Sequence, residues 1–339
     1  MVQLKMVDRV RMGVIGAGGI VQWAHLPNLK LLYDRVEVRV VFSRSIERAR
    51  EVAIKFGVPE ATDEWRYIIS RGDIDAVLIA TPNYTHKDIA VEAARAGKHI
   101  FLEKPIALSV RDGLEIVREA ERAGVKLMIG HCLRFWPEYV KVREAVISNA
   151  IGEPRIVRAY RLSSFPTWAG WHRFKDLSGG VVIDLMIHDL DFLRWCLGEV
   201  DEVFGYTAKF SETSIDNMDH AMSILRFKGG AIAYVEASWS FSRSFPFTTY
   251  LEVAGTKGLL TIDNRSTWTV SVFRDNTQES LAPMDRSAYF SELKSFIEWI
   301  QSGVKPPIEP MDAVEAIRIA LAVYKSSEKG MPVKVSEVE

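Results

Sequence analysis

The chain has 339 residues, 48% of them apolar and 26% charged, with 43 Lys+Arg against 44 Asp+Glu and a formal net charge of -1. This length allows two domains, and the balanced charge without a basic run argues against a nucleic-acid partner. The two cysteines, Cys132 and Cys196, form no cluster at metal-ligand spacing, so neither a disulfide scaffold nor a metal site is expected. No segment has the apolar length of a signal peptide or a membrane span, so we expect a cytoplasmic protein without membrane contact.

The first predicted strand, residues 10–15, runs directly into a glycine-rich turn. The turn, Gly16-Ala17-Gly18-Gly19-Ile20, is followed by a helical pattern over residues 21–32. In this context a GxGxxG-like turn places a dinucleotide pyrophosphate on the helix amino terminus. Val21 occupies the position of the third glycine of the GxGxxG pattern, where a small residue is usual. The predicted dinucleotide contacts are Gly16, Gly18, Gly19 and Ile20.

The second predicted strand, residues 36–42, ends in Ser43-Arg44. An acidic residue at this position would bind the ribose hydroxyls of NAD. A hydroxyl and a guanidinium suit a 2′-phosphate instead, and Arg48 on the following helix can add charge. The sequence therefore favours NADP as the cofactor, with NAD possible. The alternative is that Arg44 is an ordinary solvated residue at a helix start.

The rest of the first half alternates helices with strands. Strands are predicted at 75–80, 99–102 and 126–130, and helices at 47–56, 65–70, 87–96 and 110–123. This repetition predicts a doubly wound parallel sheet in an N-terminal Rossmann domain, residues 1–131. The loop after the strand at 75–80 reaches the same sheet edge, where Thr81, Pro82 and Asn83 are expected to contact the cofactor. His86 either joins them or caps the next helix.

The strand at 99–102 ends abruptly in Glu103-Lys104-Pro105. Pro105 has no N–H and disfavours helical geometry at Lys104, so strand pairing should stop there. Lys104 is then held at a carboxyl strand end, the edge where open parallel sheets bind ligands. A lysine beside a carboxylate in such a crevice is a candidate proton donor, and Glu103 is expected beside the cofactor. The alternative is a plain surface salt bridge.

From residue 132 onward the pattern changes to successive strands. A helix at 137–149 precedes strands at 154–165, 201–211, 221–227, 231–241, 248–254, 258–262 and 267–273, and helices at 289–301 and 312–327 close the chain. Strands without intervening helices predict a large, mostly antiparallel open sheet in a C-terminal α+β domain, residues 132–339. One sheet face would be free to pack on a second copy, giving a homodimer or homotetramer.

One predicted helix interrupts these strands and carries a second chemical pattern. After Ser178-Gly179-Gly180, Asp184 and His188 lie four residues apart, on one helical face among apolar neighbours. An imidazole positioned by a carboxylate can act as an acid/base group near neutral pH. The alternative is a buried structural histidine. The loops ahead of this helix hold candidate substrate-binding residues, which are Arg134, Trp168, Trp171, His172 and Arg173. The alternative is that these side chains are plain surface anchors.

Together these motifs resemble the Gfo/Idh/MocA oxidoreductase family, over nearly the whole chain. The resemblance rests on the glycine turn, Ala80-Thr81-Pro82-Asn83, Glu103-Lys104-Pro105, Arg134-Phe135, Gly179-Gly180, Asp184…His188 and Tyr289-Phe290-Ser291-Glu292-Leu293. It implies a Rossmann domain and a second domain whose sheet often forms an oligomer face. It also implies that Lys104, Asp184 and His188 line an active site for reversible hydride transfer between NAD(P) and a secondary alcohol of a sugar or cyclitol.

Several alternatives stay open within this resemblance. His188 is expected to take the hydroxyl proton during oxidation, Lys104 to polarise the oxygen, and Asp184 to orient the substrate or the imidazole; either Lys104 or His188 can be the base. A glycosidase that uses tightly held NAD and a non-catalytic dinucleotide sensor are the competing functions, as are biliverdin-reductase-like and imine-reducing chemistries. Sensor-type relatives tend to lose the lysine or the histidine, and this chain keeps both.

Overall fold

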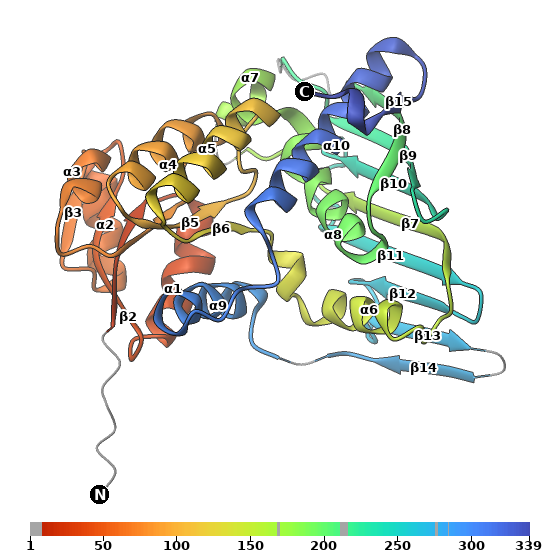
Figure 1. Cartoon of the computed structure of the whole chain (residues 1–339), viewed down its shortest axis with the longest axis horizontal. Coiled ribbons are helices and arrows are strands. Elements are labelled where there is room, and N and C mark those ends of the chain that lie inside the picture. The colour runs from red at the N-terminus through yellow and green to blue at the C-terminus, as the bar shows by residue number, and fades with distance from the viewer. Residues whose placement is uncertain (1–8, 168–169, 211–215, 275–276, 284) are drawn as a thin grey trace, which may run out of the picture. The chain divides into compact units, whose positions relative to one another are not determined.

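The structure is a computed structural model that describes residues 9–167, 170–210, 216–274, 277–283 and 285–339 (Figure 1). The chain divides into two compact units. The first holds the residues up to Ile106, then Asp112–Gly130 and Arg286–Met311, and the second holds Ala107–Arg111, His131–Asp285 and Asp312–Glu339. The predicted domain ranges, 1–131 and 132–339, stay a prediction; in this grouping residues 107–111 belong to the second unit and residues 286–311 to the first.

The first unit is built on a six-stranded parallel sheet in the order β3-β2-β1-β4-β5-β6. Its strands are β1 Val10–Ile15, β2 Val36–Phe42, β3 Glu60–Thr62, β4 Ala76–Ile79, β5 His99–Glu103 and β6 Leu127–Gly130. Every residue of β4 and β6 is buried, as expected for a parallel sheet covered on both faces. The predicted doubly wound parallel sheet is confirmed, although the three-residue strand β3 was not predicted.

The helices of the first unit largely follow the predicted ranges. They are a π-helical turn Val21–His25, α1 Leu26–Leu31, α2 Ile46–Phe56, α3 Trp65–Ser70, a 3-10 turn Asn83–Thr85, α4 His86–Arg95, α5 Val110–Ala123 and α9 Ala288–Ser302. Helix α2 begins where the Ser45 side chain accepts a hydrogen bond from the Arg48 backbone N–H, 3.2 Å away. This cap fixes the turn that follows β2.

The second unit contains a nine-stranded sheet in the order β14-β13-β12-β11-β7-β10-β9-β8-β15. Only the β7–β10 pair is parallel among the pairs described, so the predicted, mostly antiparallel sheet is confirmed. The strands are β7 Pro154–Leu162, β8 Val200–Ala208, β9 His220–Phe227, β10 Ile232–Ser238, β11 Thr248–Gly255, β12 Leu259–Asp263, β13 Val270–Arg274, β14 Thr277–Leu281 and β15 Val333–Lys334. Strands β14 and β15 were not predicted, and the predicted strand end at Ser211 lies outside the described residues.

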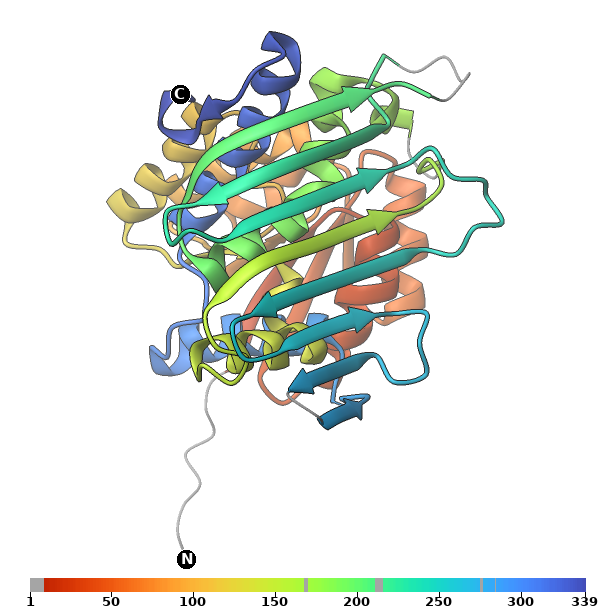
Figure 2. The ribbon, with the colours of Figure 1, turned by 90° about the vertical axis from the view of Figure 1, so that its right-hand side faces the viewer.

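The helices of the second unit connect and cover the strands on one side. They are the 3-10 turns Cys132–Phe135, Gly170–Arg173 and Val335–Glu337, α6 Pro137–Ile147, α7 Lys175–Ser178, the π-helical turn Val182–Met186, α8 Ile187–Leu197 and α10 Pro310–Lys329. Figure 2 views the sheet face on, and none of the described helices of the second unit crosses in front of its central strands. That face is therefore open.

The open face of the nine-stranded sheet is rich in apolar and aromatic side chains. Along β9 the buried residues alternate with the exposed Met222 and Ile224. Phe204 and Tyr234 pair with Ile224 from the two neighbouring strands, and Tyr206 pairs with Met222. We call the set Phe204, Tyr206, Met222, Ile224 and Tyr234 the sheet-face cluster.

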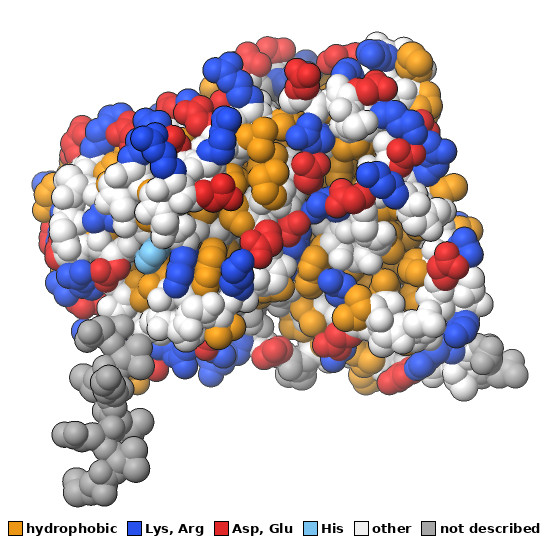
Figure 3. Space-filling view, viewed as in Figure 1, with side chains coloured by type: hydrophobic (Ala, Val, Ile, Leu, Met, Phe, Trp, Pro, Cys, Tyr) orange, Lys and Arg blue, Asp and Glu red, His pale blue; other side chains and the backbone are white. Residues whose placement is uncertain are grey.

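The surface seen in Figure 3 carries Lys and Arg side chains interspersed with Asp and Glu, with no broad area of one sign. This distribution agrees with the near-zero formal net charge of -1. Among the described residues, no helix combines the length and the apolar character that crossing a membrane requires.

Candidate active site

The carboxyl ends of four neighbouring strands in the first unit lie in register. Ile15 at the end of β1 pairs with Phe42 of β2 and with Ile79 of β4, and Ile79 pairs with Leu102 of β5. The segments that follow these strands therefore leave the sheet at one edge, where parallel α/β sheets bind ligands. They contain the predicted glycine turn, Ser43-Arg44, the Thr81 loop and Lys104.

The glycine turn has the backbone that a dinucleotide site needs. Gly16 has φ +134°, and a Cβ at this position would lie 2.3 Å from the carbonyl oxygen of Ala80, so only glycine fits. A Cβ at Gly18 would meet no atom within 4 Å, which leaves open space beside the helix start. A pyrophosphate can approach the backbone through this space, so the turn fits the predicted cofactor.

The helix after the turn departs from the regular helix expected over residues 21–32. Its first full turn, Val21–His25, is π-helical, and no side chain caps its start at Ile20. Uncapped N–H groups at a helix amino terminus are available to an anion. Val21, at the third fingerprint position, is completely buried. The predicted cofactor residues between Gly16 and Ile20 therefore lie directly before a turn that is wider than an α-helical turn and that begins at the atypical Val21.

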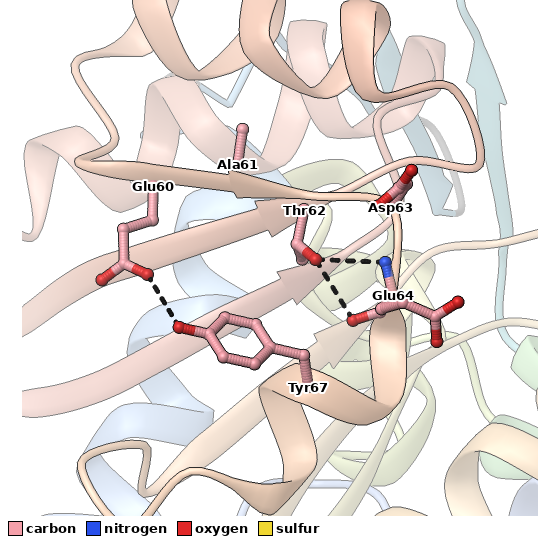
Figure 4. A pocket seen from close by; sticks show the side chains of 6 residues that line it. All are labelled: Glu60, Ala61, Thr62, Asp63, Glu64 and Tyr67. Carbon is pink, nitrogen blue, oxygen red and sulfur yellow. Dashed lines mark hydrogen bonds between the residues drawn. The ribbon is translucent and has the colours of Figure 1, made fainter.

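The segment after β2 lies near both positively and negatively charged side chains. The Ser43 N–H donates to the carbonyl oxygen of Thr62 at 3.1 Å, which holds the ends of β2 and β3 side by side. Arg44 is exposed, and Arg48 forms an ion pair with Glu51 at 3.2 Å. A pocket beside β3 is lined by Glu60, Ala61, Thr62, Asp63, Glu64 and Tyr67 (Figure 4). Its three carboxyl groups repel a phosphate, whereas Arg44 attracts one.

Two predicted residues of the loop after β4 are buried, Asn83 and His86. The Nδ1 atom of His86 lies 2.7 Å from the carbonyl oxygen of Pro105, and Nε2 lies 2.9 Å from that of Thr81. Because both oxygens can only accept, both contacts are hydrogen bonds only when both ring nitrogens carry protons. Burial lowers the pKa of His86, and the two carbonyl groups oppose that effect. The neutral ring that burial favours has a single N–H, so His86 donates to one of these two carbonyl oxygens and packs against the other.

The Lys104 turn is anchored from inside by Glu103. The Glu103 carboxylate is buried, with Oε1 2.7 Å from Nε2 of His25 and Oε2 accepting the Lys104 backbone N–H at 3.1 Å. Burial alone would raise the pKa of Glu103, but the hydrogen bond and charge of His25, together with Lys104, lower it below its usual value. Lys104 itself is partly exposed at the sheet edge. The Glu103 carboxylate is thus buried in the first unit, and its predicted contact with the cofactor stays a prediction.

In the second unit, two consecutive glycines set the start of the segment that carries Asp184. Gly180 has φ +74°, and a Cβ there would lie 2.3 Å from the Tyr324 hydroxyl oxygen and 2.4 Å from Oδ1 of Asn217. The same hydroxyl donates to the carbonyl oxygen of Gly179 at 2.8 Å. The glycines therefore allow α10, which contains Tyr324, to hold the chain just before the π-helical turn.

Asp184 and His188 lie on different kinds of helical turn, which changes the expected geometry. Asp184 belongs to the π-helical turn and His188 to α8, so the regular four-residue spacing does not apply. An Asp184 oxygen lies 3.9 Å from Nε2 of His172, and His188 Nδ1 lies 4.0 Å from the sulfur of Cys132. The second unit thus gathers two histidines, a carboxylate and a thiol around this break in the helix.

The predicted substrate residues differ in exposure. Trp171 stacks on His172 with ring centroids 3.8 Å apart, and Arg173 is exposed. Trp168 lies outside the described residues. Arg134 is 2% exposed and forms a bidentate ion pair with Asp191, with N–O distances of 2.6 and 2.9 Å.

Arg134 also donates to Asp312 at 2.8 Å, so its guanidinium joins α8 to α10 inside the second unit. Substrate contact by Arg134 stays a prediction. Sequence reasoning gave no role to Cys132 or Glu292. Of these residues, only Glu292 could have been noticed from the sequence, because it lies in the segment 289–293, one of the motifs on which the resemblance rests.

Comparison with known proteins identifies both units. Residues 10–131 match the family model described as an oxidoreductase family with an NAD-binding Rossmann fold, and residues 139–261 match the Gfo/Idh/MocA C-terminal domain. The chain belongs to the Gfo/Idh/MocA oxidoreductase family. The resemblance drawn from the sequence motifs is confirmed, as is the prediction that the chain is an NAD(P)-dependent oxidoreductase.

Gfo/Idh/MocA relatives match this chain over almost its full length. Myo-inositol 2-dehydrogenase of Thermotoga maritima is 32% identical, covering 97% of this chain and 99% of the relative. D-xylose 1-dehydrogenase (NADP(+)) 2 of Haloferax volcanii is 28% identical, covering 95% and 99%. The solved structure of levoglucosan dehydrogenase in complex with NADH has a TM-score of 0.90 at 23% identity, over 97% and 99%, and shows the same fold.

Proposed function

We propose that this protein catalyses reversible hydride transfer between NAD(P) and a secondary alcohol of a sugar or cyclitol. The observation that carries the proposal is the alignment of Lys104 with the glycine turn at one sheet edge of the first unit. The relatives named above act on myo-inositol and D-xylose by their names, which supports a polyol substrate. NAD(P) supplies the nicotinamide ring that exchanges the hydride.

The protein's part in this reaction is to handle the hydroxyl proton and to orient the alcohol. When a secondary alcohol becomes a ketone, its carbon gives up a hydride and its oxygen gives up a proton. We assign the proton transfer to Lys104 and His188, with either one as the base, and the orientation of the substrate or the imidazole to Asp184. Trp171 and Arg173 are the proposed polyol contacts.

We propose NADP as the preferred cofactor, with NAD also accepted. Ser43 and the exposed Arg44 support the preference, because a guanidinium pairs well with a 2′-phosphate. The carboxyl groups of Asp63 and Glu64 in the neighbouring pocket oppose it. Named relatives include an NADP-type enzyme and a structure with NADH, so both cofactors occur among similar proteins.

We also propose that the protein is a homodimer or homotetramer that associates through the open face of its nine-stranded sheet. The sheet-face cluster supports this, because contiguous exposed apolar side chains mark protein interfaces. Its cytoplasmic location stays a prediction from the sequence.

The proposal is tested by following nicotinamide absorbance with NADP and NAD against a panel of aldoses, inositols and ketosugars. We expect turnover of at least one polyol, and Lys104→Ala and His188→Ala should each lower kcat by about 100-fold or more, because each removes a proton-transfer group. Lys305→Ala, at an exposed lysine paired with Glu309, and His220→Ala, at the start of β9, are the matched controls.

Unchanged kcat in both Lys104→Ala and His188→Ala contradicts the assignment of proton transfer to these residues. Cofactor binding without turnover of any polyol in the panel favours the dinucleotide sensor instead. Cleavage of glycosides with a cofactor that never exchanges favours the glycosidase.

A further inference from the structure

Three ionisable side chains meet in the interior of the first unit, next to the Lys104 turn. His25 comes from the π-helical turn before α1, Glu103 from the end of β5, and Glu292 from α9. Their exposed fractions are 0%, 8% and 0%. One nitrogen or oxygen of each lies within 4.8 Å of those of the other two. We call these three residues the buried cluster.

Glu103 behaves as a carboxylate in this cluster. One of its oxygens lies 2.7 Å from His25 Nε2, and the other accepts the Lys104 backbone N–H at 3.1 Å. Both contacts use Glu103 as an acceptor, which is the role of the ionised form. The negative charge of Glu103 is therefore already compensated by His25 and by the lysine turn.

Glu292, unlike Glu103, has surroundings that disfavour a negative charge. Among the described residues neither of its carboxyl oxygens has a hydrogen-bond partner, and no part of the residue is exposed. A buried carboxylate without partners is costly and is relieved by taking up a proton. Burial, followed by the neighbouring charge of Glu103, raises the pKa of Glu292 well above its usual value. Both arguments favour the neutral carboxylic acid.

A neutral Glu292 gives the cluster one further hydrogen-bond donor, in addition to His25. Its O–H can reach the Glu103 carboxylate or His25 through one internal water, because a gap of up to 4.8 Å is short enough for a single bridge. Nδ1 of His25 and both oxygens of Glu292 are the buried atoms left for such a water to bond. Ionised Glu292 would instead place a second negative charge against Glu103.

We propose that Glu292 is a positioning residue for Lys104: as a neutral acid it completes the buried cluster that holds the Lys104 turn, and a negative charge at Glu292 would displace that turn. The charged and titratable groups around the buried cluster are Lys104 next to the end of β5, His86 from α4 and Tyr289 from α9. The effect on catalysis rests on the proposed role of Lys104, whereas the protonation of Glu292 does not.

A divalent cation is the competing occupant, since one histidine and two carboxylates are suitable ligands. The short His25–Glu103 contact argues against it. Two ligands of one tetrahedral zinc ion, at ordinary bond lengths, lie about 3.4 Å apart. The Nε2–Oε1 distance is 2.7 Å, which is a hydrogen-bond distance with a proton between the two atoms.

The protonation is tested without any enzyme assay, on the full chain and on Glu292→Gln, which keeps a neutral polar side chain. Glu298→Gln is the matched control, because Glu298 lies on the same helix in an exposed ion pair with Arg35. Infrared spectroscopy at neutral pH should show the carbonyl band of a protonated carboxyl group in the wild type and in Glu298→Gln. Glu292→Gln should lack that band.

Thermal unfolding over pH gives a second readout of the same proton. In the unfolded chain Glu292 ionises near its ordinary pKa, but in the folded chain it ionises only at higher pH. Between these two pKa values the folded state holds the extra proton, so the stability of the wild type falls as pH rises. Glu292→Gln lacks this fall, so its melting temperature should gain on that of the wild type as pH increases through this interval.

The positioning role is tested by the pH profile of kcat/KM for the best polyol. We expect Glu292→Gln to match the wild type near neutral pH and to keep its activity at alkaline pH, where the wild type loses it. Glu298→Gln should keep the wild-type profile. A purely structural role for Glu292 would change the level of activity without moving the alkaline limb of the profile.

Three results overturn the inference. These are the lack of a protonated-carboxyl band in the wild type, an alkaline limb that Glu292→Gln does not move, and a stoichiometric metal ion found in the wild type by elemental analysis and lost in Glu292→Gln. If no polyol is turned over, the proposed function fails by itself. The infrared and thermal measurements then still decide whether Glu292 carries a proton.

Discussion

The proposed preference for NADP over NAD rests mainly on one exposed guanidinium, that of Arg44. A charge-assisted hydrogen bond contributes about 1.5–3 kcal/mol, so Arg44→Ala should raise KM for NADP by roughly tenfold to 100-fold. KM for NAD should stay unchanged, because the adenosine ribose of NAD has no phosphate for Arg44 to bind. Initial rates with each cofactor at saturating polyol measure both constants.

Arg66→Ala is the control for this measurement. Arg66 is also exposed in the first unit, but it is on α3 in an ion pair with Glu92. If Arg44→Ala changes KM for both cofactors equally, or leaves KM for NADP unchanged, Arg44 does not bind the 2′-phosphate. The acidic pocket at Asp63 and Glu64 would then be the dominant charge at this strand end.

Residues at strand ends could be predicted from the sequence, whereas the buried cluster could not. The glycines at 16 and 18 and Pro105 act through the local backbone, so their effect can be read from neighbouring residues. Glu292 acts on Glu103 only because α9 returns to the first unit from far along the chain. No local sequence pattern predicts such a long-range contact. The same is true of Cys132, whose sulfur lies 4.0 Å from His188.

The segment from Gly179 to α8 depends on the left-handed backbone at Gly180. Gly180→Ala should destabilise the protein by about 2–5 kcal/mol, the sum of the left-handed strain and of overpacking against Tyr324 and Asn217. The melting temperature should fall, and kcat should fall with it even at temperatures where the variant is folded, because the turn that carries Asp184 is displaced. Calorimetry and the polyol assay measure the two effects.

Gly170→Ala is the control in the same unit, because an added Cβ at Gly170 meets no atom within 4 Å. This substitution should leave both stability and kcat near their wild-type values. If Gly180→Ala has the same small effect as Gly170→Ala, the close approach of Tyr324 does not hold this segment. If Gly180→Ala lowers the stability but keeps a normal kcat, the packing of α10 against this segment does not determine the position of Asp184.

Helices and strands were predicted best where their patterns were long. The apolar strands β1 and β2 and the helix α5 have the predicted bounds. The strands that were missed, β3, β14 and β15, are short and contain no apolar run. The strands β4 and β6 are also short, but their residues are apolar, and both were predicted. Both π-helical turns were predicted as regular helix, since hydrophobic spacing does not reveal an i→i+5 turn. Each of them carries a residue of interest, His25 in one and Asp184 in the other.

For the whole molecule, the sequence predicted both sheets but not how the chain is shared between them. The change from alternating helices and strands to successive strands near residue 131 reflects a real change of architecture. The sequence does not show that α9 belongs to the first unit, because its pattern is that of an ordinary amphipathic helix. The domain that binds the cofactor is therefore completed by a segment near the end of the chain.

The open sheet face gives the prediction that applies to the assembled molecule. Ile224, at the centre of the sheet-face cluster, is 42% exposed, with Phe204 and Tyr234 beside it on the neighbouring strands. A charge placed there would be buried without a partner when two copies meet, which costs several kcal/mol. Ile224→Glu should therefore convert the wild-type oligomer to monomers in light-scattering measurements, while the fold stays intact by circular dichroism.

Ile54→Glu is the matched control, since Ile54 is an exposed isoleucine on α2 of the first unit. It should leave the oligomer unchanged, because the association is proposed to use the sheet of the second unit alone. A monomeric wild type contradicts the association itself. An oligomer that survives Ile224→Glu shows that another surface joins the copies, and the exposed apolar side chains of the sheet then need a different partner to explain them.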